Sequence, residues 1–255
     1  MTKKNKRRLL VILSIIIVGA ITSIIYYNKK IKNKHGIINK ISDLKIPTSY
    51  ENGILGIDVS KWQGEINWKK IVQNNKIKFA YCRSTCANIF GRLDTDESYA
   101  RNIENLKKYP QFKKGSYHYL SPYISGKKQA DYFIENSIFE KGDLIPVLDI
   151  EKAHNLSKTR LIKVINDFIL EFKQKTKLEI MIYSYLSFYR DHLIDQFPNN
   201  KLWIANYRNN DYKIKNTNWN IWQYTETGKM IGINAYVDIN VFNGDSLDLN
   251  DILIQ

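Results

Sequence analysis

An apolar run followed by a helix-like stretch recurs five times between residues 56 and 195, and this alternation restricts the possible folds more than any other feature. Strands that alternate with helices favour right-handed βαβ units and a parallel sheet. The short apolar or alternating runs lie at 56–62, 77–84, 114–120, 144–151 and 179–185. The stretches with helical periodicity follow them at 67–75, 96–109, 125–139, 157–176 and 186–195.

This alternation stops after residue 200. Three further segments, at 201–207, 220–225 and 236–242, have the pattern of strands, but their connections are turn-rich and too short for full helices. The sequence therefore predicts eight strands and five helices. Because a regular eight-fold βα barrel takes about 250 residues, we expect an α/β fold of an abbreviated, TIM-like kind, (β/α)5(β)3.

The N-terminal part of the chain has the composition of a membrane signal. Residues 9–27 form an uncharged apolar run, close to the roughly 20 residues that cross a bilayer as a helix. Five basic residues precede this run and four follow it within a few positions, which favours a cytoplasmic N-terminus. A cleaved signal peptide is the alternative, because small residues at 18–20 resemble a cleavage site. In either case we expect the rest of the chain to be exported.

We therefore divide the chain into four parts: a short basic cytoplasmic tail (1–8), a transmembrane anchor (9–27), a juxtamembrane spacer (28–53) and a folded domain (54–255). The formal net charge of +14 comes mostly from the first 40 residues, which hold ten Lys or Arg and no acidic residue. A nucleic-acid-binding domain concentrates positive charge on its folded part. The charge distribution therefore argues against a nucleic-acid partner.

The two cysteines, Cys82 and Cys86, lie in one predicted strand. On an extended strand their Cα atoms would be about 13 Å apart, which is too far for a disulfide unless a turn separates them. Two small semi-buried thiols and a bridge across a turn both remain possible from the sequence. No histidine lies near enough in sequence to suggest a zinc site.

The strand at 144–151, LIPVLDIE, ends in two carboxylates. Residues two apart on a strand project to the same face, so Asp149 and Glu151 point together while Ile150 points into the packing behind them. Barrel enzymes build their active sites at the C-terminal ends of their strands. Two carboxylates so close disfavour joint ionisation, so one pKa should rise. A glycosidase needs such a pair, although a solvated strand end would look the same.

Two more acids lie on strands that a closed barrel makes neighbours. Asp58 is in the first predicted strand and Asp238 is in the last. We expect them to meet on the rim that carries Asp149 and Glu151, although each alone could be a structural aspartate.

Aromatic residues are abundant at the predicted strand ends, which suits a groove that binds sugar rings. They are Trp62, Tyr117, Tyr119, Tyr183, Trp203, Trp222 and Tyr224. Many of them could instead fill the core. His118 is expected to be structural, because it alternates with Tyr117 and Tyr119 and so faces the other way.

The chain lacks the short motifs of other common chemistries, including G-x-S-x-G, the Walker A loop, G-x-G-x-x-G and H-E-x-x-H. No histidines pair at metal-ligand spacing, so we expect neither a metal nor a cofactor. A mechanism that uses only acids remains.

With these features, the chain resembles family 25 of the glycoside hydrolases, the lysozymes that cut peptidoglycan. The resemblance extends from about Gly56 to Gly244 and is carried in order by GIDVSKWQGEINW, GSYHYLSP, KKQADYFIE, PVLDIE, IYSYLSFY, LWIANY, WQYTETGKMIGI and VDINVFNG. The family fold, a barrel of five βα units and three further strands, agrees with the element count above.

The resemblance implies a role for each acid. Glu151 would be the general acid that protonates the leaving oxygen of the β-1,4 bond between N-acetylmuramic acid and N-acetylglucosamine. Asp149 would stabilise the developing positive charge or orient the substrate's N-acetyl group. Asp58 and Asp238 match the other two active-site acids and would position substrate and tune the pair.

The resemblance also places Tyr117, Tyr183, Trp203 and Gln223 in the substrate groove. It implies that the partner is a peptidoglycan glycan strand. From the N-terminal segment we expect the catalytic domain to act in the bacterial cell envelope, outside the cytoplasm, and we expect that domain to be monomeric. Removal of the N-terminal segment would release it as a secreted protein. The nucleophile, either a carboxylate or the substrate's own acetamide, stays open at this point.

One segment departs from the family pattern. Where a Lys-Ala-Thr-Glu-Gly-like sequence is usual, this chain has RSTCANIF, with Arg83 at the place of the lysine and Cys86 at the place of the acid. The change could alter a groove subsite. Two other functions stay open: a hydrolase of another N-acetylhexosamine polymer such as chitin, and a catalytically silent module that binds cell-wall glycans.

Overall fold

The structure is a computed structural model that describes residues 46–47, 50, 52–88, 90–207 and 217–255. The predicted cytoplasmic tail and membrane anchor, and most of the predicted spacer, lie outside these residues. Within the described ranges, no helix is both long and apolar enough to cross a membrane. The described residues all belong to one unit, Asp43–Gln255.

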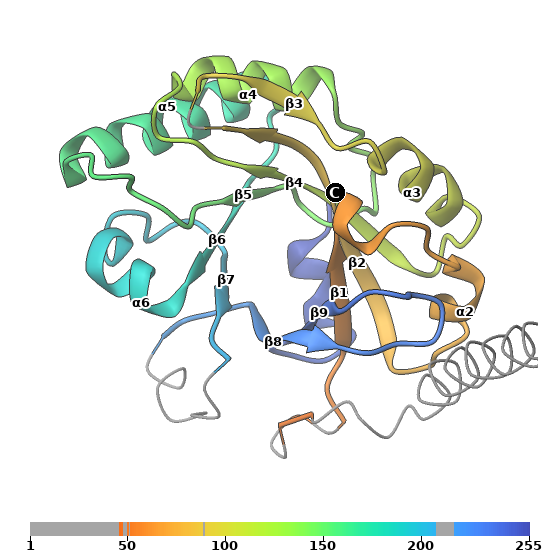
Figure 1. Ribbon diagram of the computed structural model, residues 1–255. Coiled ribbons are helices and arrows are strands. Elements are labelled where there is room, and N and C mark those ends of the chain that lie inside the picture. Colours follow the sequence, from red (N-terminus) through yellow and green to blue (C-terminus); the bar gives the residue numbers. More distant parts are fainter. Residues whose placement is uncertain (1–45, 48–49, 51, 89, 208–216) are drawn as a thin grey trace, which may run out of the picture. The chain divides into compact units, whose positions relative to one another are not determined.

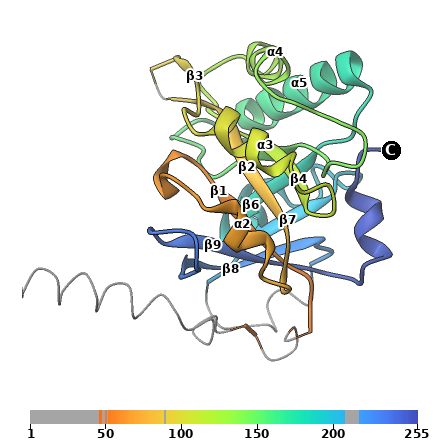
Figure 2. The same cartoon turned by 90° about the vertical axis from the view of Figure 1, so that its right-hand side faces the viewer.

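Eight strands close into a barrel (Figures 1 and 2). They are β1 (Leu55–Val59), β2 (Ile77–Ala87), β4 (Lys113–Tyr119), β5 (Val147–Asp149), β6 (Met181–Tyr185), β7 (Leu202–Ala205), β8 (Ile221–Gly228) and β9 (Val237–Phe242). The neighbours follow the order β1-β9-β8-β7-β6-β5-β4-β2, and a parallel pairing of β1 with β2 closes the ring. The predicted eight-stranded α/β barrel is confirmed.

The direction of β9 differs from the parallel sheet that the sequence predicts. This strand runs antiparallel to both of its neighbours, β1 and β8, whereas the other pairs within the ring are parallel. A tight connection without a helix can only return the chain in the opposite direction, because parallel strands need a long crossover. The barrel is therefore mixed and is not a regular eight-fold βα barrel. Consequently β9 begins at the rim where the parallel strands end.

The helices cover the outside of the first part of the barrel (Figure 1). They are α2 (Trp68–Val72), α3 (Tyr99–Leu106), α4 (Gly126–Glu135), α5 (Lys158–Thr176) and α6 (Leu186–Phe188), which continues as one π-helical turn (Tyr189–Leu193). Only α5 matches its predicted length, and Ser157 caps it by accepting a hydrogen bond from the backbone N–H of Arg160 at 3.3 Å. The other four are shorter than predicted. Two 3-10 turns, Lys61–Gln63 and Asp248–Ile252, complete the helical elements of the described residues.

A hairpin that the sequence analysis did not predict follows β2. The strand continues to Ala87, turns through Asn88 and returns as β3 (Leu93–Thr95), which pairs antiparallel with the end of β2. The side chain of Asn88 accepts hydrogen bonds from the backbone N–H groups of Phe90 and Arg92, and so sets the turn. The predicted helix at 96–109 therefore begins later, at Tyr99.

The core has two layers, as the alternation of side chains on the strands requires. Phe79 and Tyr81 of β2 point into the barrel, where they join Val147, Trp203 and other residues of an inner cluster. The intervening side chains, such as Ala80 and Cys82, belong to an outer cluster between the barrel and its helices. Gly56 makes room for this interior, because a Cβ atom there would lie 2.2 Å from the ring of Phe79.

The C-terminal segment closes the end of the barrel opposite to the strand ends that carry the acids. Ile252 and Ile254 are buried against the inner cluster. Three backbone hydrogen bonds fix them, each of 2.8 Å: Gly142 N–H to the carbonyl of Ile254, Ile145 N–H to that of Ile252, and Ile254 N–H to that of Asp143. The segment therefore covers the lower end of the inner cluster.

His118 and the cysteines are part of the packing. His118 is fully buried, with Thr85 Oγ1 at 2.7 Å from Nδ1 and Gln129 Oε1 at 3.2 Å from Nε2, and burial lowers its pKa to about 4. The prediction of a structural histidine is confirmed. Cys82 and Cys86 both lie on β2 as free thiols, so the strand geometry prevents a disulfide between them.

Candidate active site

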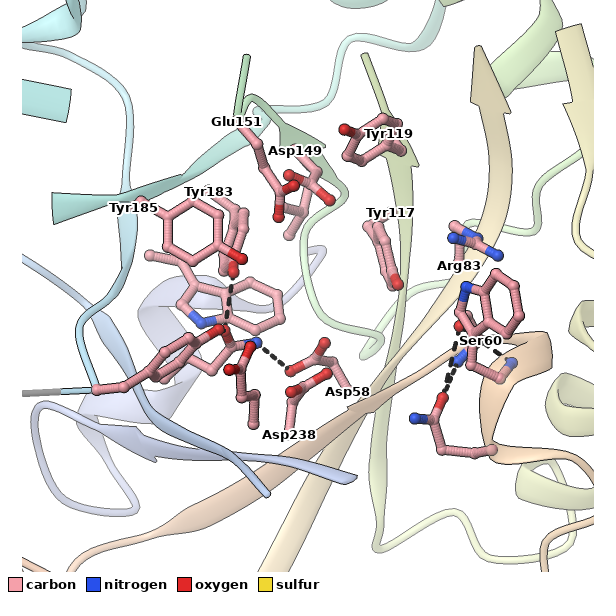
Figure 3. Close-up of a pocket in the computed structure, with 17 residues that line it drawn as sticks. Asp58, Ser60, Arg83, Tyr117, Tyr119, Asp149, Glu151, Tyr183, Tyr185 and Asp238 are labelled. Carbon is pink, nitrogen blue, oxygen red and sulfur yellow. Dashed lines mark hydrogen bonds between the residues drawn. The ribbon is translucent and has the colours of Figure 1, made fainter. Parts of the chain in front are cut away.

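The two acids of LIPVLDIE lie together at the open mouth of the barrel (Figure 3). Asp149 is the last residue of β5, and Glu151 lies two residues after it. Ile150, between them, is buried in the outer cluster. The predicted alternation is therefore confirmed, because both carboxylates line one pocket and the residue between them packs behind it.

That pocket has a volume of about 210 Å³ and is open to solvent. It brings together all eight residues that the sequence analysis selected: Asp58, Tyr117, Asp149, Glu151, Tyr183, Trp203, Gln223 and Asp238. Its other lining residues are Ser60, Trp62, Gln63, Arg83, Tyr119, Val147, Tyr185, Tyr207 and Glu226. Among the described residues, no group of three or more His, Cys, Asp or Glu is arranged to hold a metal ion.

Asp149 has an unsatisfied oxygen. It is buried, and its Oδ1 atom has no hydrogen-bond partner in the protein. Burial raises the pKa of this carboxyl well above its usual value, and the nearby charges of Glu151 and Asp58 act in the same direction. A buried polar atom without a partner is costly. Asp149 therefore combines a place in the lining of the pocket with a buried oxygen that no protein group satisfies.

Glu151 has the properties of a proton donor near neutral pH. Burial raises its pKa to about 7, and the charge of Asp58 contributes to the rise, whereas Lys152 and a hydrogen bond with Tyr119 act against it. A general acid works best when its pKa lies close to the working pH. Glu151 therefore holds its proton at mildly acidic pH and can release it to a bound substrate.

Asp58 and Asp238 are partners in the antiparallel ladder between β1 and β9. Burial raises the pKa of both carboxyls, and the hydrogen bond between them lowers the pKa of Asp58 while it raises that of Asp238. The hydrogen bond between them therefore favours the proton on Asp238 and the charge on Asp58. The predicted meeting of these two strands is confirmed.

A hydrogen-bond network beneath the pocket holds Asp58 in place. Its Oδ2 atom accepts from Gln223 Nε2 and from Asn240 Nδ2, each at 2.8 Å. Asn240 in turn accepts from Trp203 Nε1 at 2.9 Å. The hydroxyl of Tyr183 donates to Gln223 Oε1 at 2.8 Å, and that of Tyr207 donates to the same atom at 2.6 Å.

This network changes the interpretation of three residues predicted to contact substrate. Trp203 and Gln223 are each only 2% exposed and Tyr183 is 6% exposed, so they form the floor of the pocket. Their contacts in the protein orient Asp58. The prediction that they also touch a sugar stays a prediction.

Several residues of the site were not selected from the sequence. Asn240 lies two positions after Asp238 on β9, so the same alternation that paired Asp149 with Glu151 could have identified it. Tyr185 and Tyr207 lie at the ends of predicted strands and could have been included with the other aromatics. Glu226 lies on an extension of β8 beyond its predicted end at 225, and no signal in the sequence placed it at the mouth.

The aromatic residues at the strand ends divide into two groups. Trp62, Tyr117 and Tyr119 line the pocket, and Trp62 is 73% exposed at its rim. Trp222 and Tyr224 instead lie in the outer cluster, because they alternate with Gln223 on β8 and so face away from the interior. Those two aromatics are core residues.

The sequence model of the family described as "Glycosyl hydrolases family 25" matches residues 57–233. YegX of Escherichia coli strain K12 is 33% identical over 205 residues, which cover 79% of this chain and 73% of that protein. "Lysozyme M1" of Streptomyces globisporus is 32% identical over 216 residues, or 78% of this chain and 70% of that protein.

Two solved structures extend the likeness to the fold. The bacterial lysozyme from Streptomyces coelicolor superposes with a TM-score of 0.69 at 29% identity, and covers 80% of this chain and 98% of its own. A family 25 glycosyl hydrolase from Bacillus anthracis superposes with a TM-score of 0.72 at 26% identity, and the superposition covers 80% of this chain and 96% of that chain. The family match, these relatives and the four acids at one barrel mouth lead to the same conclusion: this chain belongs to family 25 of the glycosyl hydrolases and is a glycoside hydrolase.

Proposed function

We propose that the chain is a lysozyme that hydrolyses the β-1,4 bond between N-acetylmuramic acid and N-acetylglucosamine in peptidoglycan. Relatives named lysozyme support the substrate class, since one of them is 32% identical over most of the chain. The observation that carries the proposal is the pairing of Glu151, whose pKa rises to about 7, with the unpartnered oxygen of Asp149 in one pocket.

In this proposal Glu151 is the general acid. Cleavage leaves an alcohol on one sugar, and that oxygen must gain a proton as the bond breaks. Glu151 lines the pocket and keeps its proton up to about neutral pH, so it can supply this proton. After bond cleavage the same group, now ionised, can take a proton from the attacking water.

Asp149 acts on the other side of the reaction. Asp149 lines the pocket, and its buried Oδ1 atom has no partner in the protein. As a carboxylate it stabilises the positive charge that develops on the sugar; as an acceptor it orients the N-acetyl group of the substrate. Both roles use the same free oxygen, and the second would make the acetamide the nucleophile.

Asp58 and Asp238 tune this pair. The negative charge of Asp58 raises the pKa of both Asp149 and Glu151. Its position depends on the amide groups of Gln223 and Asn240. One retained negative charge below the two reacting carboxyls keeps the proton on Glu151 until substrate arrives.

The test is a turbidity assay on bacterial cell walls with the full-length chain. We expect the unchanged protein to lyse the walls, and we expect Glu151→Gln to lower the rate of lysis by a factor of about 100 or more. Glu179→Gln is the matched control, because Glu179 is exposed, forms an ion pair with Lys173 and does not line the pocket. Equal lysis by the unchanged protein and the Glu151 variant would contradict the role of Glu151. Hydrolysis of chitin without lysis of walls would replace the proposed substrate by a neutral N-acetylhexosamine polymer.

We also propose that residues 9–27 anchor the enzyme in the membrane of a bacterial envelope, with the domain from residue 54 outside the cytoplasm as a monomer. The support is the uncharged apolar run with basic residues on both sides. Fractionation of cells tests the anchor: the full-length chain should sediment with membranes and release into the soluble fraction when residues 9–27 are replaced by a polar linker. Protease added to spheroplasts should digest the domain if it lies outside.

A further inference from the structure

Arg83 is the only basic side chain among the described residues that line the pocket. Five acids line the same pocket: Asp58, Asp149, Glu151, Glu226 and Asp238. The ion pair of Arg83 is with none of them. It is with Asp96, which does not line the pocket.

Asp96 holds the guanidinium of Arg83 in a fixed position. The Nε and Nη2 atoms lie 2.9 and 2.8 Å from Oδ2 of Asp96. The Asp96 side chain is 0% exposed, whereas that of Arg83 retains 14%. Asp96 also accepts hydrogen bonds from the backbone N–H groups of Lys61 and Ser98. Arg83 is therefore anchored from behind by a buried carboxylate, and its cation is presented to the pocket.

The wall that carries Arg83 is distinct from the wall that carries the tyrosine network. Figure 3 shows Arg83 beside Tyr117 and Ser60, across the pocket from Tyr183 and Tyr185. Among the described lining residues, Arg83 therefore places the one basic side chain of the pocket on this wall.

The acids of the pocket oppose an anionic ligand less than their number suggests. Burial raises the pKa of Asp149, Glu151 and Asp238, which favours their uncharged forms. The pocket therefore carries less negative charge than five fully ionised carboxylates would. An anionic group that approaches the wall of Arg83 meets correspondingly less repulsion.

We propose that Arg83 binds a carboxylate of the substrate and so makes the site selective for an acidic glycan over a neutral one. This inference rests on the proposed function. Each N-acetylmuramic acid carries a lactyl ether, which ends in a free carboxylate in peptide-free strands, and stem peptides carry carboxylates of their own. A guanidinium matches the planar geometry of a carboxylate, and its hydrogen bonds to an ionised group are among the stronger ones in proteins.

Binding to the full-length Glu151→Gln protein tests the inference without turnover. Calorimetry compares three ligands: a peptide-free N-acetylmuramic acid–N-acetylglucosamine oligomer with free lactyl carboxylates, its methyl ester, and the same oligomer with stem peptides. We expect the free acid to bind about 10- to 100-fold more tightly than the ester. When Arg83→Gln is added, the affinity for the free acid should fall to that for the ester, and the affinity for the ester should stay the same. Arg83→Lys should restore part of the affinity for the free acid.

The ligand pairs separate the sources of the carboxylate. Loss of affinity in Arg83→Gln for the peptide-free acid places the lactyl group at Arg83, whereas loss only for the peptide-bearing oligomer places a stem-peptide carboxylate there. Unchanged ester affinity in Arg83→Gln shows that the pocket itself is intact.

The inference would be overturned if the Glu151→Gln protein bound the free acid, the ester and the peptide-bearing oligomer with equal affinity. It would also be overturned if an Arg83 variant lowered the affinity for all three ligands equally. Failure of the proposed function is a separate result. It would appear as absence of cell-wall lysis by the unchanged protein, whatever Arg83 binds.

Discussion

Asp58 and Asp238 face each other across the antiparallel ladder of β1 and β9, and the hydrogen bond between them favours the proton on Asp238. The two residues are far apart in the chain, and the pairing of β1 with β9 brings them together. Their pairing sets the charge below the reacting carboxyls. The following predictions test what this arrangement and its surroundings do.

Substitutions in this pair of acids should have unequal effects. Asparagine at 238 can replace the protonated carboxyl, because its N–H group still donates to Asp58. We expect Asp238→Asn to reduce kcat within about 10-fold and Asp58→Asn to reduce it at least about 100-fold. Single-turnover rates on purified cell walls measure both. A larger loss in Asp238→Asn than in Asp58→Asn would show that the proton is on the other partner.

The activity should fall on the alkaline side near the pKa of Glu151, which burial raises to about 7. The general acid must be protonated, so activity is present below this pKa and lost as pH rises through it. The charge of Asp58 raises that pKa, so Asp58→Asn should move the alkaline limb to lower pH. A pH profile of kcat/KM for both proteins checks the shift, and an unmoved limb would exclude Glu151 as the titrating group.

Glu151→Gln should make the protein more stable at alkaline pH. In the folded state Glu151 keeps its proton up to about pH 7, whereas in the unfolded chain it ionises at its ordinary, lower pKa. The folded state therefore binds more protons between these values, and its stability falls as pH rises through that window. Glutamine has no charge to bury. We expect Tm at pH 8 to rise by about 2 °C or more, and an equal Tm of variant and parent at pH 4 is the internal control.

Trp62 at the pocket rim should contribute to substrate binding. It is 73% exposed, and its position on the rim makes its indole available to a sugar ring. Trp62→Ala should raise KM about 5- to 10-fold with a smaller change in kcat. Phe90→Ala is the matched control, since Phe90 is 87% exposed but does not line the pocket. A KM that rises equally in both variants would count against a role for Trp62.

The segment that covers the lower end of the inner cluster should matter for stability. Ile252 is 0% exposed, so Ile252→Ala should lower the free energy of unfolding by about 2–5 kcal/mol. Leu247→Ala, at a residue that is 76% exposed, should change it by less than about 0.5 kcal/mol. Urea denaturation followed by tryptophan fluorescence compares them. A small effect at Ile252 would mean that the barrel floor does not depend on this segment.

Much of the site was predictable because the strand period is a local property. The pairing of Asp149 with Glu151 and the outward direction of Ile150 follow from alternation alone, and the structure confirms both. The meeting of Asp58 with Asp238 required one further assumption, closure of the barrel, which the β1–β9 ladder satisfies.

The features of the fold and the site that the sequence did not predict depend on contacts between distant segments. The hairpin of β2 and β3 forms before the predicted helix at 96–109, because Asn88 makes the turn. The helix itself begins only at Tyr99, and Asp96 is held by Arg83 and Lys61 instead. The antiparallel direction of β9 follows from the short connection before it. Trp203 had the same pattern as a sugar-binding aromatic, and only its hydrogen bond to Asn240 shows that it supports Asp58.

The placement of β9 between β1 and β8 also has a consequence for when the enzyme becomes active. Closing a ring through strands near opposite ends of a domain is a late, long-range step, because loop-closure entropy must be met before the contacts form. Asp58 gains its partners Asp238 and Asn240 only when this step is complete. A nascent chain that has not yet supplied residue 240 therefore has no assembled acid cluster. If these acids carry the proposed reaction, we expect no hydrolytic activity before synthesis of the barrel is finished.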